Sequence, residues 1–205
     1  MFRAMDPYII IISIPAVLWA ISFHEFCHGY AAKLLGDPTA ENEGRLTLNP
    51  IKHIDPIGVL MLLFAGLGWA KPVPVNSRYF KNVRRDIIIV SIAGIVGNLL
   101  TAFLFVTIAR IIPMQVLGRA GVDFISIMIY INVGLAAFNI LPVPPLDGSK
   151  VLYGFIPYKW LRYYYFLENY GFYILIILVL TNIIHIIMSP IMTFFLRLIG
   201  FYSIY

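Results

Sequence analysis

The chain has 205 residues, of which 60% are hydrophobic and only 12% are charged, and its mean hydropathy is +0.87. A soluble domain carries about twice that share of charged residues, so the composition excludes an ordinary soluble protein and predicts an integral membrane protein. The formal net charge is +5. Because the basic residues lie between apolar stretches, they favour lipid headgroups over nucleic acid as partners.

Four apolar stretches are long enough to cross a bilayer as helices, which requires roughly 20 residues. A fifth apolar run, residues 57–68, is too short to cross and is predicted to be re-entrant, with its backbone covered by protein. The four spans are expected at residues 8–30, 87–112, 124–141 and 170–188, the last with an apolar tail to residue 201.

These stretches predict one all-α membrane domain covering residues 1–205. Its motif-bearing core spans about residues 8–158, and an additional transmembrane segment spans about residues 168–201. Residues 45–48 and 73–76 alternate polar and apolar, which predicts a small β-ribbon. Eleven of the fifteen basic residues lie on the side of the membrane that carries this ribbon. The positive-inside rule therefore makes that side cytoplasmic.

The first predicted span contains the sequence His24-Glu25-Phe26-Cys27-His28. Helical residues four apart differ by about 400° of rotation, so both imidazoles point the same way and can hold one zinc ion. Glu25 lies beside them, where it can act as the general base for a zinc-activated water. At ~1.5 Å per residue, His24 lies ~24 Å into a ~30 Å hydrocarbon core, which predicts a site in the cytoplasmic half of the bilayer.

A catalytic zinc site usually has three protein ligands, so a third is expected. Asp147 is the best candidate among the few acidic residues, because it follows the third span on the same side as His24. Pro142, Pro144 and Pro145 prevent a regular helix there, and a broken backbone at membrane depth is where a polar ligand is tolerated. A turn or helix-cap role is the alternative for Asp147.

Several motifs in the same order resemble the site-2 protease family of intramembrane zinc metalloproteases, peptidase family M50. They are H-E-x-x-H at residues 24–28, G-R-L-T-L-N-P at 44–50, K-P-V-P-V-N at 71–76, G-x-x-x-N at 94–98 and N-x-x-P-x-P-P-L-D-G at 139–148. The chain looks like a minimal form without the PDZ or CBS domains of some relatives.

The resemblance implies an intramembrane zinc metalloendopeptidase that cleaves peptide bonds in or near transmembrane segments of membrane proteins. It implies one Zn²⁺ per chain held by His24, His28 and Asp147, with Glu25 as the catalytic residue. It also implies that Asn98 and Asn139 support substrate or the developing oxyanion.

Other interpretations remain for these residues. The two histidines and Glu25 could form a structural polar cluster, and Asn98 could bond neighbouring helices. Cys27 could be a ligand but is better explained as a small helix residue. The alternative function is a non-proteolytic metal-binding membrane protein, either a silent substrate-binding relative or a metal transporter. The 71–76 segment could accept an extended substrate by strand addition.

Overall fold

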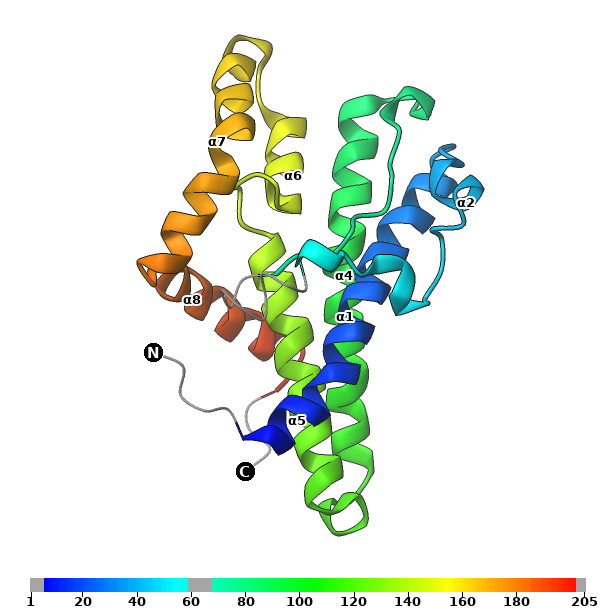
Figure 1. Cartoon of the computed structure of the whole chain (residues 1–205), viewed down its shortest axis with the longest axis vertical. Coiled ribbons are helices and arrows are strands. Elements are labelled where there is room, and N and C mark those ends of the chain that lie inside the picture. Colours follow the sequence, from blue (N-terminus) through cyan, green and yellow to red (C-terminus); the bar gives the residue numbers. More distant parts are fainter. Residues whose placement is uncertain (1–5, 59–67, 202–205) are drawn as a thin grey trace.

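Three long helices, α1 (Pro7–Leu34), α4 (Val83–Ile111) and α5 (Met114–Asn139), pack side by side as a bundle (Figure 1). The computed structural model describes residues 6–58 and 68–201. Four helical segments of the described chain are long and apolar enough to cross a membrane, which confirms the prediction of a multi-pass helical membrane protein. They are Pro7–Leu34, Val83–Ile111, Gln115–Asn139 and Tyr158–Leu180.

Local sequence signals set the ends of the helix that carries the H-E-x-x-H motif. The Asp6 carboxylate accepts a hydrogen bond from the Tyr8 amide at 2.9 Å, and Pro7 occupies the first helical position, where a missing N–H does no harm. Gly36, at φ +101°, follows the end of the helix. Short elements come next, namely α2 (Thr39–Asn42), η1 (Pro50–His53) and η2 (Ser77–Tyr79).

Beyond the bundle, α6, η3 and α7 form an arm (residues 147–180), and glycines allow it to pack closely against the rest of the protein. The short helix α6 (Asp147–Phe155) packs on α4 at Gly154, where an added Cβ would lie 2.3 Å from the Ile88 side chain. The turn η3 (Tyr158–Trp160) leads into α7 (Leu161–Leu180). Gly171 of α7 lies so close to Pro144 that a Cβ would meet its carbonyl oxygen at 2.3 Å. These contacts fix the arm against the segment that precedes Asp147.

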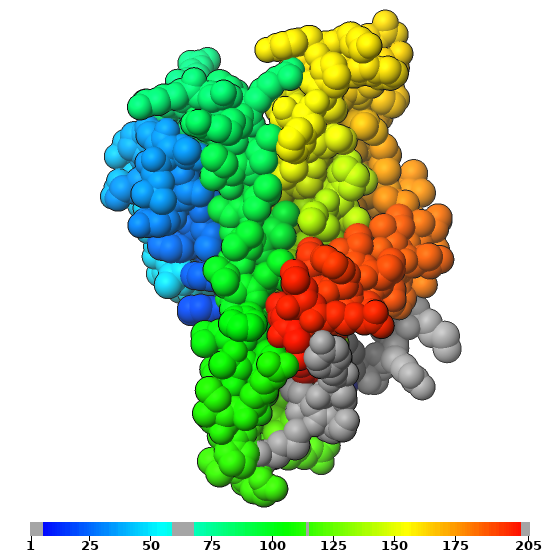
Figure 2. Space-filling model, turned by 180° about the vertical axis from the view of Figure 1, so that it is seen from behind, coloured from blue at the N-terminus to red at the C-terminus, as the bar shows by residue number. Residues whose placement is uncertain are grey.

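The last helix, α8 (Ile183–Leu198), turns back from α7 and packs on α5 (Figure 1). Seen from behind, α4 lies between α1 with α2 on one side and the α6–α7 arm on the other (Figure 2). The largest apolar core joins α4, α5, α8 and the residues that follow α8. Its buried members are Ile95, Ala102, Val106, Ile125, Ile129, Val133, Ala136, Ala137, Phe195, Ile199 and Phe201.

The structure corrects the boundaries of the last two predicted spans. The fourth, predicted as one helix over 170–188, is divided at Asn182, whose left-handed φ of 59° ends α7 and precedes α8. Hydropathy does not detect such a break, because the residues on both sides are apolar. The third helix begins earlier than the predicted residue 124, and Gly118, whose φ of 62° is not helical, separates its first residues from the rest. Its polar residues there are satisfied in place, since Asp123 receives the Tyr8 hydroxyl at 3.0 Å and lies 3.8 Å from Arg119.

The predicted β-ribbon is wrong for the part of the chain that the structure describes. Neither 45–48 nor 73–76 forms a strand, and an isolated bridge between Ile54 and Ala70 is the only β pairing among the described residues. The reason lies in the hydrogen bonds of the second segment, whose amides at Val73 and Asn76 donate to the carboxylates of Glu25 and Asp37. The predicted re-entrant run falls largely on residues 59–67, which lie outside the described residues.

Candidate active site

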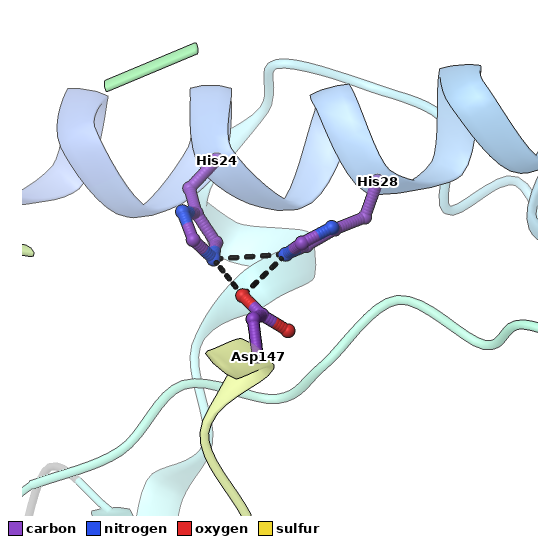
Figure 3. Close-up of side chains that lie close together, drawn as sticks. All are labelled: His24, His28 and Asp147. Carbon is purple, nitrogen blue, oxygen red and sulfur yellow. Dashed lines mark hydrogen bonds and ion pairs between the residues drawn. The ribbon is translucent and has the colours of Figure 1, made fainter. Parts of the chain in front are cut away.

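His24 and His28 of α1 meet Asp147, the first residue of α6, at one point inside the protein (Figure 3). The two Nε2 atoms are 2.9 Å apart, and Asp147 Oδ2 lies 3.0 Å from His24 Nε2 and 2.9 Å from His28 Nε2. All three residues are buried. The structure thus brings together the three residues that the sequence predicts as zinc ligands.

The outer nitrogens of the two imidazoles fix their tautomers. His28 Nδ1 lies 2.7 Å from the Val90 carbonyl oxygen of α4. Because a carbonyl only accepts hydrogen bonds, this nitrogen carries the proton. His24 Nδ1 lies 2.7 Å from Asn98 Oδ1. Each ring therefore directs its Nε2 toward Asp147, and in the neutral tautomer that these contacts select, Nε2 has a free lone pair, as in metal-binding histidines.

A chain of buried amides sets the orientation of Asn98. Its Nδ2 donates to the Ala20 carbonyl and to Asn132 Oδ1, both at 3.0 Å, so its Oδ1 is left to accept from His24. Asn132 in turn donates to the Met128 carbonyl at 2.8 Å. Both asparagines are 0% exposed. This relay connects α1, α4 and α5 and holds the His24 ring in place.

In these tautomers the meeting point consists of three electron-pair donors. Two imidazole nitrogens and one carboxylate oxygen approach within 3.0 Å, and the relay and the Val90 carbonyl hold the ring protons on the far side. Such acceptors repel one another unless a proton or a metal cation lies between them. Tetrahedral zinc ligands at 2.0–2.1 Å stand about 3.3 Å apart, so this triangle fits zinc after a slight expansion.

Gly94 of α4 leaves the space that the rings occupy. A Cβ at this position would lie 2.5 Å from His28 Nε2 and 2.7 Å from His24 Cε1. The glycine in the 94–98 motif therefore admits the histidine pair, while Asn98 of the same motif orients one member. Gly97, one turn away, faces Cys27 instead, since a Cβ added to Gly97 would lie 2.5 Å from Cys27 Sγ. Cys27 is outside the donor cluster.

The backbone around Asp147 delivers its carboxylate to this point. Leu146 is extended at φ −67° and ψ 155°, so α6 begins at Asp147 itself. Gly148 permits the first turn of α6 to lie against the end of α5, because a Cβ would meet the Ile140 carbonyl oxygen at 2.1 Å. The second carboxylate oxygen, Oδ1, accepts from Lys150 Nζ at 3.1 Å, which leaves Oδ2 for the histidines.

The donor cluster lies in the wall of a cavity of about 610 Å³. Glu25 lines the same cavity, and its Oε2 accepts the Val73 amide at 2.7 Å. Asn139 also lines it, while its Nδ2 bonds the Leu135 carbonyl within α5 at 3.1 Å. The remaining lining residues come from the 72–77 segment, α4, the segment before α6, α6 itself and α7. They are Pro72, Val73, Val75, Ser77, Val83, Ile87, Val90, Ser91, Pro145, Lys150, Tyr153, Tyr164, Tyr165 and Glu168.

Three contributors to the site are absent from the sequence predictions. Asn132 completes the amide relay, Val90 contributes only its backbone carbonyl, and Lys150 occupies one oxygen of Asp147. Asn132 had a signal, because it is an uncharged polar residue in the middle of a predicted span, where polar groups need partners. A backbone carbonyl leaves no mark in a sequence.

If the amide relay supports the metal site, Asn132→Leu is expected to weaken zinc binding. We expect the affinity for zinc to fall by about 10-fold, the lower end of the loss caused by removing an outer partner of a ligating histidine, because Asn132 acts on His24 through Asn98. Ser126→Ala is the matched control, because Ser126 lies on the same helix and its hydroxyl bonds only the Val122 carbonyl of its own turn. Competition with a chromophoric chelator measures both affinities. Equal zinc affinity in both variants would show that the amide relay does not support zinc binding.

Comparison with known proteins finds similarity to a peptidase family and to proteins named as candidate zinc metalloproteases. The model of Peptidase family M50 matches residues 109–181, which include Asn139 and Asp147. YwhC of Bacillus subtilis is 40% identical over 193 residues, which cover 91% of this chain and 86% of the relative. Rip2 of Mycolicibacterium smegmatis is 29% identical over 180 residues, covering 84% and 68%. Both are named as candidate zinc metalloproteases.

A Methanocaldococcus jannaschii protein, also named as a candidate zinc metalloprotease, is 31% identical over 147 residues that cover 70% of each chain. No solved structure matches this chain significantly. The identity to YwhC extends over nearly the whole of both chains, and the family model covers the segment that carries Asp147. The chain therefore belongs to peptidase family M50, the site-2 protease family of zinc metalloproteases.

Proposed function

We propose that this protein is an intramembrane zinc metalloprotease that hydrolyses peptide bonds in or near transmembrane segments of membrane proteins. The observation that carries the proposal is the convergence of His24, His28 and Asp147 beside Glu25 in one cavity. The histidines belong to a helix that is long and apolar enough to span the bilayer. A metalloprotease centre carried on such a helix acts on substrates that reach it from the membrane.

His24, His28 and Asp147 are proposed to hold one zinc ion per chain. Three protein donors leave a coordination position free, which is the arrangement of catalytic rather than structural zinc. When bound, zinc supplies a Lewis acid that activates water and polarises a carbonyl group. The protein's contribution is to select the tautomers in which Nδ1 carries the ring proton and Nε2 faces the metal, through Asn98 for one ring and the Val90 carbonyl for the other.

Glu25 is the proposed general base. Its Oε2 is held by the Val73 amide at 2.7 Å, which orients the carboxylate in the cavity and leaves Oε1 to receive a proton. Glu25 takes that proton from the attacking water and returns it to the leaving amine, so it ends the cycle unchanged. Proton transfer of this kind contributes about 10²–10⁴-fold to a rate.

The two asparagines that the sequence singles out receive different proposed roles. Asn139 lines the cavity, where its amide can bond a substrate carbonyl or the developing oxyanion. Asn98 is fully buried, and its amide bonds His24, Ala20 and Asn132. Its support of the reaction therefore passes through His24.

We further propose that the cavity opens in the cytoplasmic half of a cell membrane, following the eleven basic residues on that side of the predicted spans. Water reaches the site from there, and the partners are the lipid bilayer and a transmembrane protein or peptide substrate. A substrate helix hides its carbonyls in backbone hydrogen bonds, so it unwinds locally before it is cut.

Metal removal tests the function. Purified protein in detergent is expected to cut a model transmembrane substrate, to stop after treatment with a chelator, and to recover with one equivalent of zinc per chain. Mass spectrometry of the products locates the cut, which is expected within or beside the apolar segment. Cuts confined to soluble segments would contradict intramembrane cleavage. Zinc binding without cleavage of a panel of such substrates would favour a silent, substrate-binding relative, and zinc flux in vesicles would favour a transporter.

A further inference from the structure

Two sequence motifs outside the donor cluster, Gly44–Pro50 and Lys71–Asn76, meet next to α1. Arg45 from the first motif donates through one guanidinium nitrogen to the carbonyl oxygens of Lys71 at 2.9 Å and Pro72 at 3.1 Å. The residue that follows Pro72 is Val73, whose amide donates to Glu25. The buried arginine thus holds two carbonyl groups of this segment, and the amide that follows them bonds the proposed base.

The second motif offers Glu25 a single, fixed donor. Pro72 and Pro74 have no backbone N–H, so Val73 is the only residue of this triplet that can donate to a carboxylate from its backbone. Val73 is 7% exposed. Its side chain lies against Gly29, one helical turn after Glu25, and a Cβ added to Gly29 would lie 3.0 Å from Val73 Cγ1. The amide therefore reaches Glu25 only while this segment lies on α1.

Arg45 is well placed to hold the segment there. It is 7% exposed and, among the described residues, takes part in no ion pair. A buried guanidinium without a carboxylate is costly, and its two carbonyl contacts compensate part of that cost, while Nε has no hydrogen-bond partner in the part of the chain that the structure describes. The neighbouring Leu46 packs on the same glycine, because a Cβ added to Gly29 would lie 3.2 Å from Leu46 Cδ1. Leu46 touches the helix through packing alone, which makes it a natural control.

We propose that Arg45 is a positioning residue for catalysis, which sets the Glu25 carboxylate through the Lys71 and Pro72 carbonyls and the Val73 amide. The proposal rests on the proposed role of Glu25 as general base. It predicts that losing the guanidinium changes the rate of the chemical step while the metal ligands remain intact, because Arg45 contacts neither histidine nor Asp147.

The kinetic test compares Arg45→Gln, Arg45→Lys and Leu46→Ala with the wild type. We expect Arg45→Gln to lower kcat by about 10²-fold, the size of effect that a small misplacement of a reacting group produces. KM and zinc content are expected to stay at wild-type values. Arg45→Lys retains more kcat than Arg45→Gln because an ammonium can still reach a carbonyl, and Leu46→Ala retains full kcat. A raised KM with unchanged kcat would overturn the proposal and make the segment a substrate-binding element.

A matched pair at Val73 keeps the test open if Arg45→Gln does not fold. Val73→Pro and Val73→Ala both remove the side chain, but only proline removes the N–H. We expect kcat to be at least tenfold lower for the proline variant than for the alanine variant. Equal kcat values in the two variants would show that the amide bond to Glu25 is not needed.

A measurement without turnover separates this inference from the proteolytic function. In protein labelled with ¹⁵N-valine, the Val73 amide signal is identified by its absence from the Val73→Ala spectrum. Arg45→Gln is expected to move this signal in the same direction as Glu25→Gln, because both weaken one hydrogen bond. An unmoved signal in Arg45→Gln would overturn the proposal even in an active protease. A moved signal in a chain that cuts no substrate would support the contact and reject the proposed function.

Discussion

Glu25→Gln is expected to lower the rate of cleavage by about 10²–10⁴-fold, the contribution of a general acid–base group, with zinc still bound at one ion per chain. Glutamine keeps an oxygen that can accept the Val73 amide, so the local hydrogen bond persists in a weaker, uncharged form. It cannot take a proton from water at neutral pH. The donor cluster of His24, His28 and Asp147 is unchanged. Cleavage assays with zinc analysis on the same samples measure both quantities.

Glu41→Gln is the control for this substitution. Glu41 lies on α2, outside the cavity, and makes an exposed ion pair with Lys33 at 2.6 Å. The same chemical change there is expected to leave the rate at its wild-type value. Cleavage that survives in Glu25→Gln would mean that another group activates the water. Loss of zinc together with activity would instead show that Glu25 maintains the metal site.

Gly94→Ala is expected to disrupt the zinc site itself. The new methyl carbon would lie 2.5 Å from His28 Nε2, 2.6 Å from His28 Cε1 and 2.7 Å from His24 Cε1. Carbon atoms in contact prefer about 3.5–4.0 Å, so the rings must move by about 1 Å. Their outer nitrogens are tied to Asn98 and Val90, which leaves them little room to do so. We expect zinc affinity to fall by at least about 100-fold.

Gly97→Ala is the matched substitution on the same helix. Its methyl carbon would lie 2.5 Å from the Cys27 sulfur, the end of a side chain that can rotate away. We expect this variant to keep its zinc and to lose some thermal stability. Similar loss of zinc in both variants would indicate that general disturbance of α4, rather than occupation of the histidine space, is responsible. Wild-type zinc binding in Gly94→Ala would contradict the geometry of the site.

Much of the neighbourhood of the site can be predicted from the sequence. The four-residue spacing of His24 and His28 requires a common helix face, and the structure places their Nε2 atoms 2.9 Å apart. Asp147 is distant in the chain, but its side of the membrane and the prolines before it indicate the same region, and Oδ2 does reach both histidines. Their action as zinc ligands stays a prediction that the metal measurements test.

The supporting contacts could not be predicted, because they depend on how helices rotate against one another. Asn98 could bond a neighbouring helix or assist the reaction, and only the packed bundle shows that its oxygen faces His24. Asn132 gives no periodic signal that would pair it with Asn98. The Val90 carbonyl is a backbone group whose acceptance of a side-chain proton is decided by tertiary packing alone.

The errors in the fold have a similar origin. Alternation at residues 73–76 predicted a strand that does not form, since the carboxylates of Glu25 and Asp37 occupy two of its amides. The apolar run from α7 into α8 reads as continuous, yet a single left-handed residue, Asn182, divides it. Hydropathy measures partition into lipid and contains no information about φ.

The amide relay also orders the events of biogenesis. The helix α1 carries both histidines and precedes α4 and α5 in the chain, but the tautomers that expose their lone pairs depend on Asn98 and Val90 of α4, and Asn132 of α5 orients Asn98. The carboxylate arrives later still, with residue 147. A nascent chain therefore has no complete zinc site until three helices have been inserted and packed. If these residues hold zinc as proposed, metal uptake is expected to follow the packing of the helices.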